Sequence, residues 1–214
     1  MPLIRIVAVV TVLFISGCFI SGCAVSTAYR PADVPEEPVA SSDRVAGRVL
    51  IYTTQTDDDR VITAGATSIT AAGLRLTTPV GTMVREIALK VFSEVATKGA
   101  EAGQDFTNDG RYAIVLRPQI ENFDYGFPRP RLGIEIIPQV RMVLRVTLLD
   151  STGGVMLEKD YDSGTVSGSP HVVSGKLVER TNKLAHQVMY ELMRRAATDV
   201  HLFQQTQAAV EKMD

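Results

Sequence analysis

The reactive side chains of this 214-residue sequence include its two cysteines, Cys18 and Cys23. Each closes the same unit, Phe-Ile-Ser-Gly-Cys, which is written twice in tandem over residues 14–23. A cysteine thiolate is a nucleophile that can be alkylated or oxidised. Residues 6–14, in front of the repeat, are apolar or small, and the segment before them carries one positive charge, Arg5. A run of this length is typical of an export signal, since a membrane span needs about 20 apolar residues.

The sequence Ile-Ser-Gly-Cys resembles the lipobox of bacterial lipoproteins. The resemblance implies that the thiol receives diacylglycerol, that the peptide is cut just before the cysteine, and that further acyl chains such as palmitate complete the anchor. A single acyl chain binds membranes only marginally, so several chains would be needed for a stable anchor. Both copies fit the pattern. We favour Cys23, because processing at Cys18 would leave a second reactive cysteine near the mature terminus, and Cys18 is the alternative.

The residue after the acylated cysteine indicates the destination of such a lipoprotein. In bacteria with two membranes, a residue other than Asp at this position directs the protein to the outer membrane. Ala24 follows Cys23, and Phe19 follows Cys18. The resemblance therefore implies an anchor in the cell outer membrane and a domain that faces the periplasm. A plain signal peptide with incidental cysteines, or an uncleaved anchor, would be the other explanation.

Composition predicts four parts along the chain. Residues 1–22 form the lipoprotein signal peptide, and residues 23–43 form the lipidated N-terminus and a polar tether, whose prolines and glutamates favour extended chain. Residues 44–200 form a single α+β periplasmic domain, and residues 201–214 a polar C-terminal tail. A mature chain whose one cysteine is lipidated has no disulfide, so the core must stabilise the domain.

The charge and aromatic content exclude several classes of partner. The chain has 22 basic and 24 acidic side chains, and loss of Arg5 with the signal removes one more basic group. The sequence has no basic stripe of the kind that would indicate nucleic-acid binding. It also has no polybasic segment of the kind that would indicate binding to an anionic membrane surface. With 6% aromatic residues and no tryptophan, the sequence does not favour a stacking platform for sugars or single strands.

No catalytic or metal-binding pattern emerges from the remaining residues. His171, His186 and His201 share no ligand spacing with acidic residues or cysteine. Residues 57–59, three consecutive aspartates, lack the glycine and the downstream glutamate of a calcium loop, so a solvated turn is expected there. Residues 164–168, Gly-Thr-Val-Ser-Gly, lack the glycine that a nucleophile elbow needs two residues before its serine. We therefore expect no enzyme activity, no cofactor and no metal.

Hydrophobic periodicity predicts an α+β fold: an antiparallel sheet of about four strands covered on one face by two helices. Strands are expected over residues 45–53, 112–120, 140–149 and 155–166, with a hairpin turn at 150–154. Apolar residues spaced by three and four predict an amphipathic helix over 79–98, and a last helix is expected from about residue 174. Pro118 should occupy an edge position or a bulge.

This layout, together with the lipobox, resembles the small envelope lipoproteins of the YajG type and the auxiliary lipoproteins of ABC-type transporters. The local matches are LRLTTPVGTMVREIALKVF at the entry to the first long helix and VRMVLRVTLLDSTGGVMLEKDY at the hairpin. The resemblance implies a non-catalytic accessory of an envelope complex and transfers no functional residue beyond the lipobox. Fold-level similarity alone does not define function.

Residues 123–139, FDYGFPRPRLGIEIIPQ, join two expected strands and allow two interpretations. In the first, they form an extended hairpin arm whose apolar side chains cover the end of the sheet. In the second, Tyr125, Phe127, Arg129 and Arg131 form an exposed surface that docks a protein partner, because Tyr and Arg are enriched at binding hot spots. Lipid phosphates are a weaker alternative for the two arginines, since two charges attract an anionic surface only modestly.

Two functions follow from these observations. The first is a binding or assembly lipoprotein that scaffolds an envelope complex, with an unidentified protein partner and a membrane contact through the N-terminal lipid. The second is a carrier that holds a lipid or another apolar ligand between the sheet and the helices. A carrier needs a continuous apolar cavity of several hundred cubic ångströms, whereas the alternating Val, Leu and Ile residues of the strands are of a size to fill the core.

Overall fold

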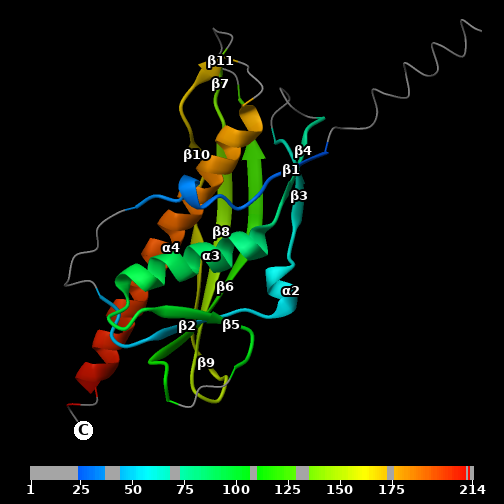
Figure 1. The fold of residues 1–214 in the computed structure, drawn as a ribbon. Coiled ribbons are helices and arrows are strands. Elements are labelled where there is room, and N and C mark those ends of the chain that lie inside the picture. Colours follow the sequence, from blue (N-terminus) through cyan, green and yellow to red (C-terminus); the bar gives the residue numbers. More distant parts are fainter. Residues whose placement is uncertain are drawn as a thin grey trace, which may run out of the picture.

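The computed structural model describes residues 24–36, 44–67, 73–106, 110–128, 135–172, 176–210 and 212. Its main sheet has six strands in the order β10-β8-β6-β2-β5, with β9 also paired to β8 (Figure 1). The strands of this sheet are β2 (Val49–Tyr52), β5 (Ala100–Gly103), β6 (Ile114–Gly126), β8 (Gln139–Leu149), β9 (Val155–Asp162) and β10 (Val166–Ser167).

The predicted α+β class holds, but the expected antiparallel sheet of about four strands is wrong in strand number and in direction. β2 pairs with β5 and with β6 in parallel, whereas β6, β8, β9 and β10 pair in antiparallel fashion. A helix lies between β2 and β5 in the sequence, and a crossover of this kind joins parallel strands. β5 reads Ala-Glu-Ala-Gly, a composition with little strand propensity, so its sequence gave no sign of an edge strand.

A smaller sheet of three strands lies beside the main one, in the order β1-β4-β3. β1 (Ala24–Ser26) runs parallel to β4 (Arg75–Thr78), and β3 (Ile62–Gly65) runs antiparallel to β4. A further pair joins β7 (Glu135–Ile136) to β11 (His171–Val172). The small sheet therefore combines a strand from the very start of the described chain with a hairpin that precedes the first long helix.

Two long helices pack on the sheet. α3 (Val80–Val95) contacts β2, β5 and β6, while α4 (Leu177–Val210) contacts β8 and β9 as well as α3. In Figure 1 both helices pass in front of the main sheet. The apolar stripe predicted for the first helix is buried, as are Leu144 on β8 and Val188 on α4, which meet in one core cluster. A short helix, α2 (Gln55–Asp58), and a 3-10 turn, η1 (Pro31–Asp33), complete the described elements.

Pro118 lies inside β6, opposite Val146 of β8. The register between β6 and β2 ends at Leu116, so within the described chain Pro118 faces no partner strand on that side. A proline there removes no ladder hydrogen bond to β2. The register with β8 shifts further along the strand, between Ile120 and Asn122, so Pro118 lies outside that bulge and occupies the predicted edge position, on the side of β2.

The residues expected to form a polar tail continue α4 as far as Val210. The side-chain amide of Gln204 accepts a hydrogen bond from the backbone N–H of Ala46 at 2.8 Å and donates one to its carbonyl at 3.0 Å. His201 contacts the carbonyl of Arg44 through Nδ1 at 2.8 Å. These contacts join the start of the predicted domain to the end of the last helix. Among the described helices, none is both long and apolar enough to cross a membrane.

Candidate functional site

Both lipobox cysteines lie outside the described residues, and the described chain begins at Ala24, directly after Cys23. From this first residue the chain pairs with β4, in the register Ala24 to Arg75, Val25 to Leu76 and Ser26 to Thr77. The extended tether predicted over residues 23–43 is therefore wrong for residues 24–36, which we call the N-terminal strap. Residues 37–43 lie outside the described part of the chain.

The N-terminal strap crosses α4 after it leaves β4 (Figure 1). The side-chain amide of Asn182 donates to the carbonyl of Ala28 at 3.0 Å, and the Tyr29 ring stacks on His186 at a centroid distance of 5.5 Å. The backbone N–H of Arg30 donates to Nε2 of His186 at 3.0 Å. Val34, further along, is buried in the core cluster. The strap is thus an integral part of the fold.

His186 is completely buried where the N-terminal strap meets α4. Because Nε2 accepts from Arg30, the ring proton lies on Nδ1, which donates to the carbonyl of Asn182 at 2.7 Å. Burial lowers the pKa of His186, while the Asn182 carbonyl and Asp33 oppose this change and Arg30 adds to it. The neutral ring is therefore a structural joint and not a metal ligand.

Two of the four residues predicted to form an exposed docking surface, Tyr125 and Phe127, are instead buried. Tyr125 is 1% exposed and Phe127 is fully buried. The Tyr125 hydroxyl accepts a hydrogen bond from the N–H of Leu76 at 3.2 Å and donates to the carbonyl of Leu74 at 2.7 Å, so it ties β6 to the small sheet. Burial raises the pKa of this phenol. Arg129 and Arg131 lie outside the described residues, and the burial agrees with the first interpretation, an arm that covers the sheet's end.

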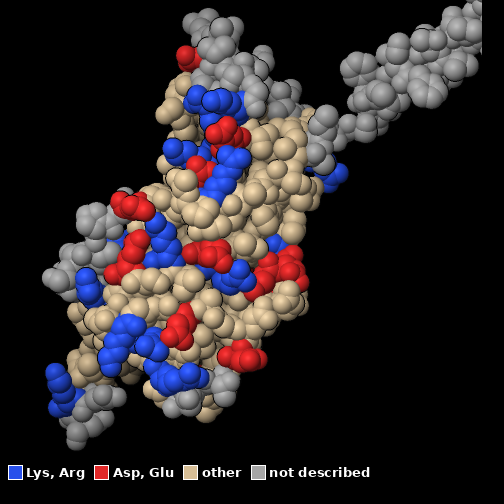
Figure 2. All heavy atoms as spheres, viewed as in Figure 1, with Lys and Arg blue, Asp and Glu red and all other residues tan. Residues whose placement is uncertain are grey.

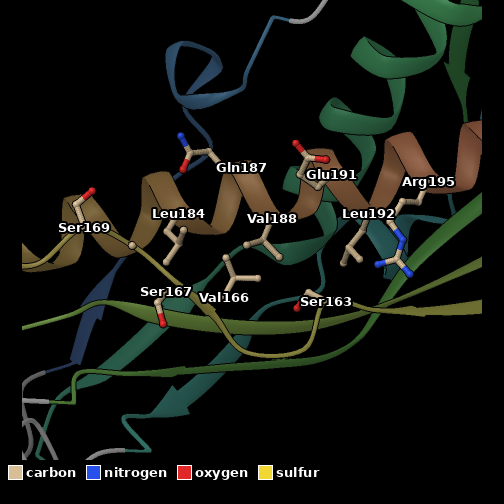
Figure 3. A pocket seen from close by; sticks show the side chains of 11 residues that line it. Ser163, Val166, Ser167, Ser169, Leu184, Gln187, Val188, Glu191, Leu192 and Arg195 are labelled. Carbon is tan, nitrogen blue, oxygen red and sulfur yellow. The ribbon is translucent and has the colours of Figure 1, made fainter.

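A groove lies between α4 and the segment 163–169, with a volume of about 510 Å³. Figure 3 shows Leu184, Val188 and Leu192 pointing from α4 towards Val166, which points back at them. These four side chains give the groove an apolar floor. The sequence interpretation missed it because residues 155–166 appeared to be one strand. The chain instead breaks between β9 and β10, where Gly164 has a φ of +61°.

Polar groups surround this apolar floor. Arg195 donates to the carbonyl of Asp162 at 3.2 Å, and its guanidinium lies 5.9 Å from the centre of the Tyr161 ring. The Ser163 hydroxyl accepts from the N–H of Met142 at 2.9 Å and donates to the carbonyl of Gly164 at 2.7 Å. A serine held in this way is poorly placed to act as a nucleophile. The groove has the features of a binding surface: an apolar centre with polar groups of both charges at its edge.

The serine of the Gly-Thr-Val-Ser-Gly segment, Ser167, lies on β10 and accepts a hydrogen bond from the Gln139 side chain at 3.0 Å. It sits on a short edge strand and not on a strand-to-helix turn, as a nucleophile elbow would require. No group of three or more potential metal ligands occurs among the residues that the structure describes.

Two of the three aspartates expected in a solvated turn, Asp57 and Asp58, are instead buried on α2, whereas Asp59 is exposed directly after it. The carboxylate of Asp57 accepts from Arg117 at 2.9 Å and from Gln119 at 2.7 Å, and it closes a capping box with Thr54. Burial alone would raise the pKa of Asp57, but the hydrogen bonds from Thr54, Gln119 and Arg117 lower it overall. The pattern Thr54-x-x-Asp57 is a capping-box signature, which could have revealed the helix in the sequence.

Asp58 forms the second ion pair of this cluster. Its carboxylate accepts from Arg85 of α3 at 2.7 Å and from Gln104 at 3.0 Å. An adjoining polar cavity of about 240 Å³, bordered by Thr53 and Asp58, has room for ordered water. Within the described residues, the cluster therefore joins α2 to α3 and to the main sheet, which is a structural role.

Comparison with known proteins finds no matching family model and no matching curated protein. A solved protein assigned as a lipoprotein from Caulobacter crescentus is 12% identical, with a TM-score of 0.44 over 78% of this chain and 93% of that chain. One assigned as a homolog of neuraminyllactose-binding hemagglutinin from Helicobacter pylori is 9% identical, with a TM-score of 0.48 over 77% and 91%. A minor lipoprotein from Acinetobacter baumannii is 12% identical, with a TM-score of 0.38 over 74% and 94%. Similarities this low do not assign a function to this chain.

Proposed function

We propose that this chain is a lipoprotein of the bacterial outer membrane, anchored through Cys23, whose periplasmic domain is a non-catalytic binding or assembly component of an envelope complex. The observation that carries the proposal is the doubled Ile-Ser-Gly-Cys sequence, whose second copy ends directly before the folded chain. Cleavage before Cys23 would leave every paired residue of β1 in place. An accessory role for a transporter is the narrower form of this proposal.

The groove between α4 and residues 163–169 is the proposed binding site. Its floor combines Leu184, Val188 and Leu192, which are already buried in the core, with the half-buried Val166, whose remaining exposed surface a partner would cover. Glu191 and Arg195 on its edge carry opposite charges, which would help to select the partner and its direction. The hydrogen bonds already made by Ser163 and Ser167 support a non-catalytic role.

A carrier of a lipid or another apolar ligand is the second candidate, and one observation favours it. The groove lies between α4 and the edge of the sheet, and its volume of about 510 Å³ falls within the range of about 300–1,000 Å³ typical of small-molecule sites. The filled core between the sheet and the two long helices favours the binding component, since bulky side chains such as Leu144 and Met142 are fully buried there.

Two measurements test the proposal. Mass spectrometry of the protein purified from membranes should find the mature chain beginning at Cys23 with a diacylglycerol and an acyl chain, and Cys23→Ala should remain unlipidated. A lipid on Cys18 would show that Cys18, and not Cys23, is the anchoring residue. The absence of any lipid would refute the lipoprotein assignment.

A photo-crosslinking residue at Gln187, on the groove, should then capture a protein in intact cells. The matched control is the same residue at Glu101 on β5, the opposite edge of the sheet. Capture at Gln187 that is lost on Val166→Glu, a change at a half-buried position of the groove, and absent at Glu101 would support the binding component. Capture of lipid instead would support the carrier, and equal capture at both positions would refute the groove as a binding site.

A further inference from the structure

The N-terminal strap determines where a lipid on Cys23 would leave the domain. Ala24 is paired with Arg75, and Cys23 is the preceding residue in the sequence. One residue of extended chain spans at most about 3.6 Å. The acylated residue would therefore lie beside the start of β4, next to Arg75, with Gly65 of β3 one strand further across the sheet.

Hydrogen bonds hold the N-terminal strap along its length between Ala24 and α4. Thr27 donates to the carbonyl of Thr77 at 2.9 Å, and its hydroxyl donates to that of Thr78 at 3.1 Å. The contacts of Ala28 and Arg30 with α4 follow directly. A flexible linker of about 20 residues would instead separate its ends by about 25 Å on average. A domain attached in this way cannot move far from its anchor or turn freely beneath it.

The outer surface of the small sheet suits contact with a lipid headgroup layer. Over residues 24–29, 62–67 and 73–79, the single charged side chain is Arg75. The exposed positions around it are small or neutral: Ser26, Ala28, Thr63, Gly65, Thr67 and Gly73. Figure 2 shows few charges over β1, β3 and β4, whereas Lys, Arg, Asp and Glu are mixed over the rest of the visible face. Over these three described ranges, the surface has no carboxylate that would repel lipid phosphates.

We propose that the outer face of the β1-β4-β3 sheet is the membrane-facing surface of this protein, held on the bilayer in one orientation by the short connection from Cys23 to β1. This inference rests on the proposed lipidation of Cys23. A guanidinium pairs well with phosphate, so Arg75 lies among the lipid phosphates. β9 and the C-terminal end of α4, at the opposite end of the molecule in Figure 1, extend into the periplasm.

The chain has no tryptophan, so a single introduced indole reports on one position. Gly65→Trp places it on β3, opposite Arg75, where a Cβ added at position 65 meets no atom within 4 Å. Met156→Trp, at an exposed position on β9, is the matched control. Each lipidated variant is reconstituted into vesicles of phosphatidylethanolamine and phosphatidylglycerol with a nitroxide on the headgroup. We expect quenching at position 65 to exceed that at position 156 several-fold.

A third protein carries Gly65→Trp and an insertion of Ala followed by ten Gly-Ser repeats between Cys23 and Ala24. The insertion should reduce quenching to the level of the position 156 control, because the domain is then free to leave the surface. Equal quenching at the two positions, or unchanged quenching after the insertion, would overturn the proposal. Mass spectrometry of the same samples reports separately whether Cys23 is lipidated. Thr63→Trp replaces Gly65→Trp if circular dichroism shows that the latter does not fold.

Discussion

The backbone N–H of Arg30 donates a hydrogen bond of 3.0 Å to Nε2 of His186, which lies 156 residues further along the chain. Since a neutral imidazole has one acceptor nitrogen, this bond requires the uncharged ring and assigns its proton to Nδ1. Protonation would turn the acceptor into a donor that faces another donor. The N-terminal strap and α4 are thus joined by a contact that depends on the charge of one buried side chain.

The first prediction concerns pH. Burial lowers the pKa of His186 below 6.5, so between that folded-state pKa and 6.5 the unfolded chain binds more protons than the folded one. The free energy of unfolding should therefore be constant above about pH 7 and should fall as the pH drops below about 6.5, by at most about 1.4 kcal/mol per pH unit. Urea unfolding between pH 7.5 and 5 measures this slope. His186→Gln should flatten it, and an unchanged slope in this variant would contradict the assignment.

The second prediction concerns the hydrogen bond from Asn182 to the carbonyl of Ala28. Asn182→Ala should reduce the free energy of unfolding by about 1 kcal/mol, the net worth of a typical hydrogen bond. It should also speed hydrogen exchange at the amides of Thr27 and Arg30, because both are protected only while the strap is docked. Lys183→Ala, an exposed neighbour on α4, is the control. Unchanged exchange in the Asn182 variant would show that β1 holds the strap without this contact.

Local patterns of the sequence predicted the long elements of this fold well. The helix expected over 79–98 is α3, and the strand expected over 140–149 is β8. The hairpin at 150–154 forms, with Asp150 accepting from the N–H groups of Thr152 and Gly154. Each of these depends on residues close together in sequence, so periodicity and turn chemistry are sufficient to predict them.

Features that depend on distant residues were harder to predict. Val25, Tyr29 and Val34 are apolar positions in a segment whose prolines and glutamates indicated a tether, and their partners lie on β4 and α4. Tyr125 resembled an exposed anchor because its hydrogen-bond partners, near Leu74 and Leu76, are supplied by the small sheet. The parallel pairing of β5 likewise follows from the crossover through α3 and not from its own residues.

The third prediction concerns the role of Tyr125. Tyr125→Phe keeps the ring but removes the hydroxyl that joins β6 to β4, which leaves the N–H of Leu76 without its partner. Loss of a buried partner costs about 1–3 kcal/mol, and thermal or urea unfolding should show a decrease of that size. Tyr112→Phe, which removes an exposed hydroxyl bonded to Glu101, is the control and should change stability by less than about 0.5 kcal/mol. Equal effects would show that the Tyr125 hydroxyl does not stabilise the small sheet.

The last prediction concerns the buried ion pair between Asp57 and Arg117. Arg117→Met should lower the free energy of unfolding by about 1–3 kcal/mol, because the buried carboxylate then keeps hydrogen bonds only from Thr54 and Gln119. Asp57→Asn should cost less, since Arg117 is 34% exposed and can be solvated. The double variant should cost less than the sum of the two single changes, by about 0.5–3 kcal/mol, as expected for residues in direct contact.

The control for this cycle is the pair Arg145 and Asp160 on β8 and β9, which has two similar hydrogen bonds but whose carboxylate is 48% exposed, against 10% for Asp57. Solvent screens that carboxylate, so the cycle should show a smaller coupling than that of Asp57 and Arg117. Urea unfolding of all six variants and the wild type at one pH gives both coupling energies. Similar coupling in the two cycles would show that burial of Asp57 adds nothing, and α2 would then be held to the sheet by its apolar contacts and not by this ion pair.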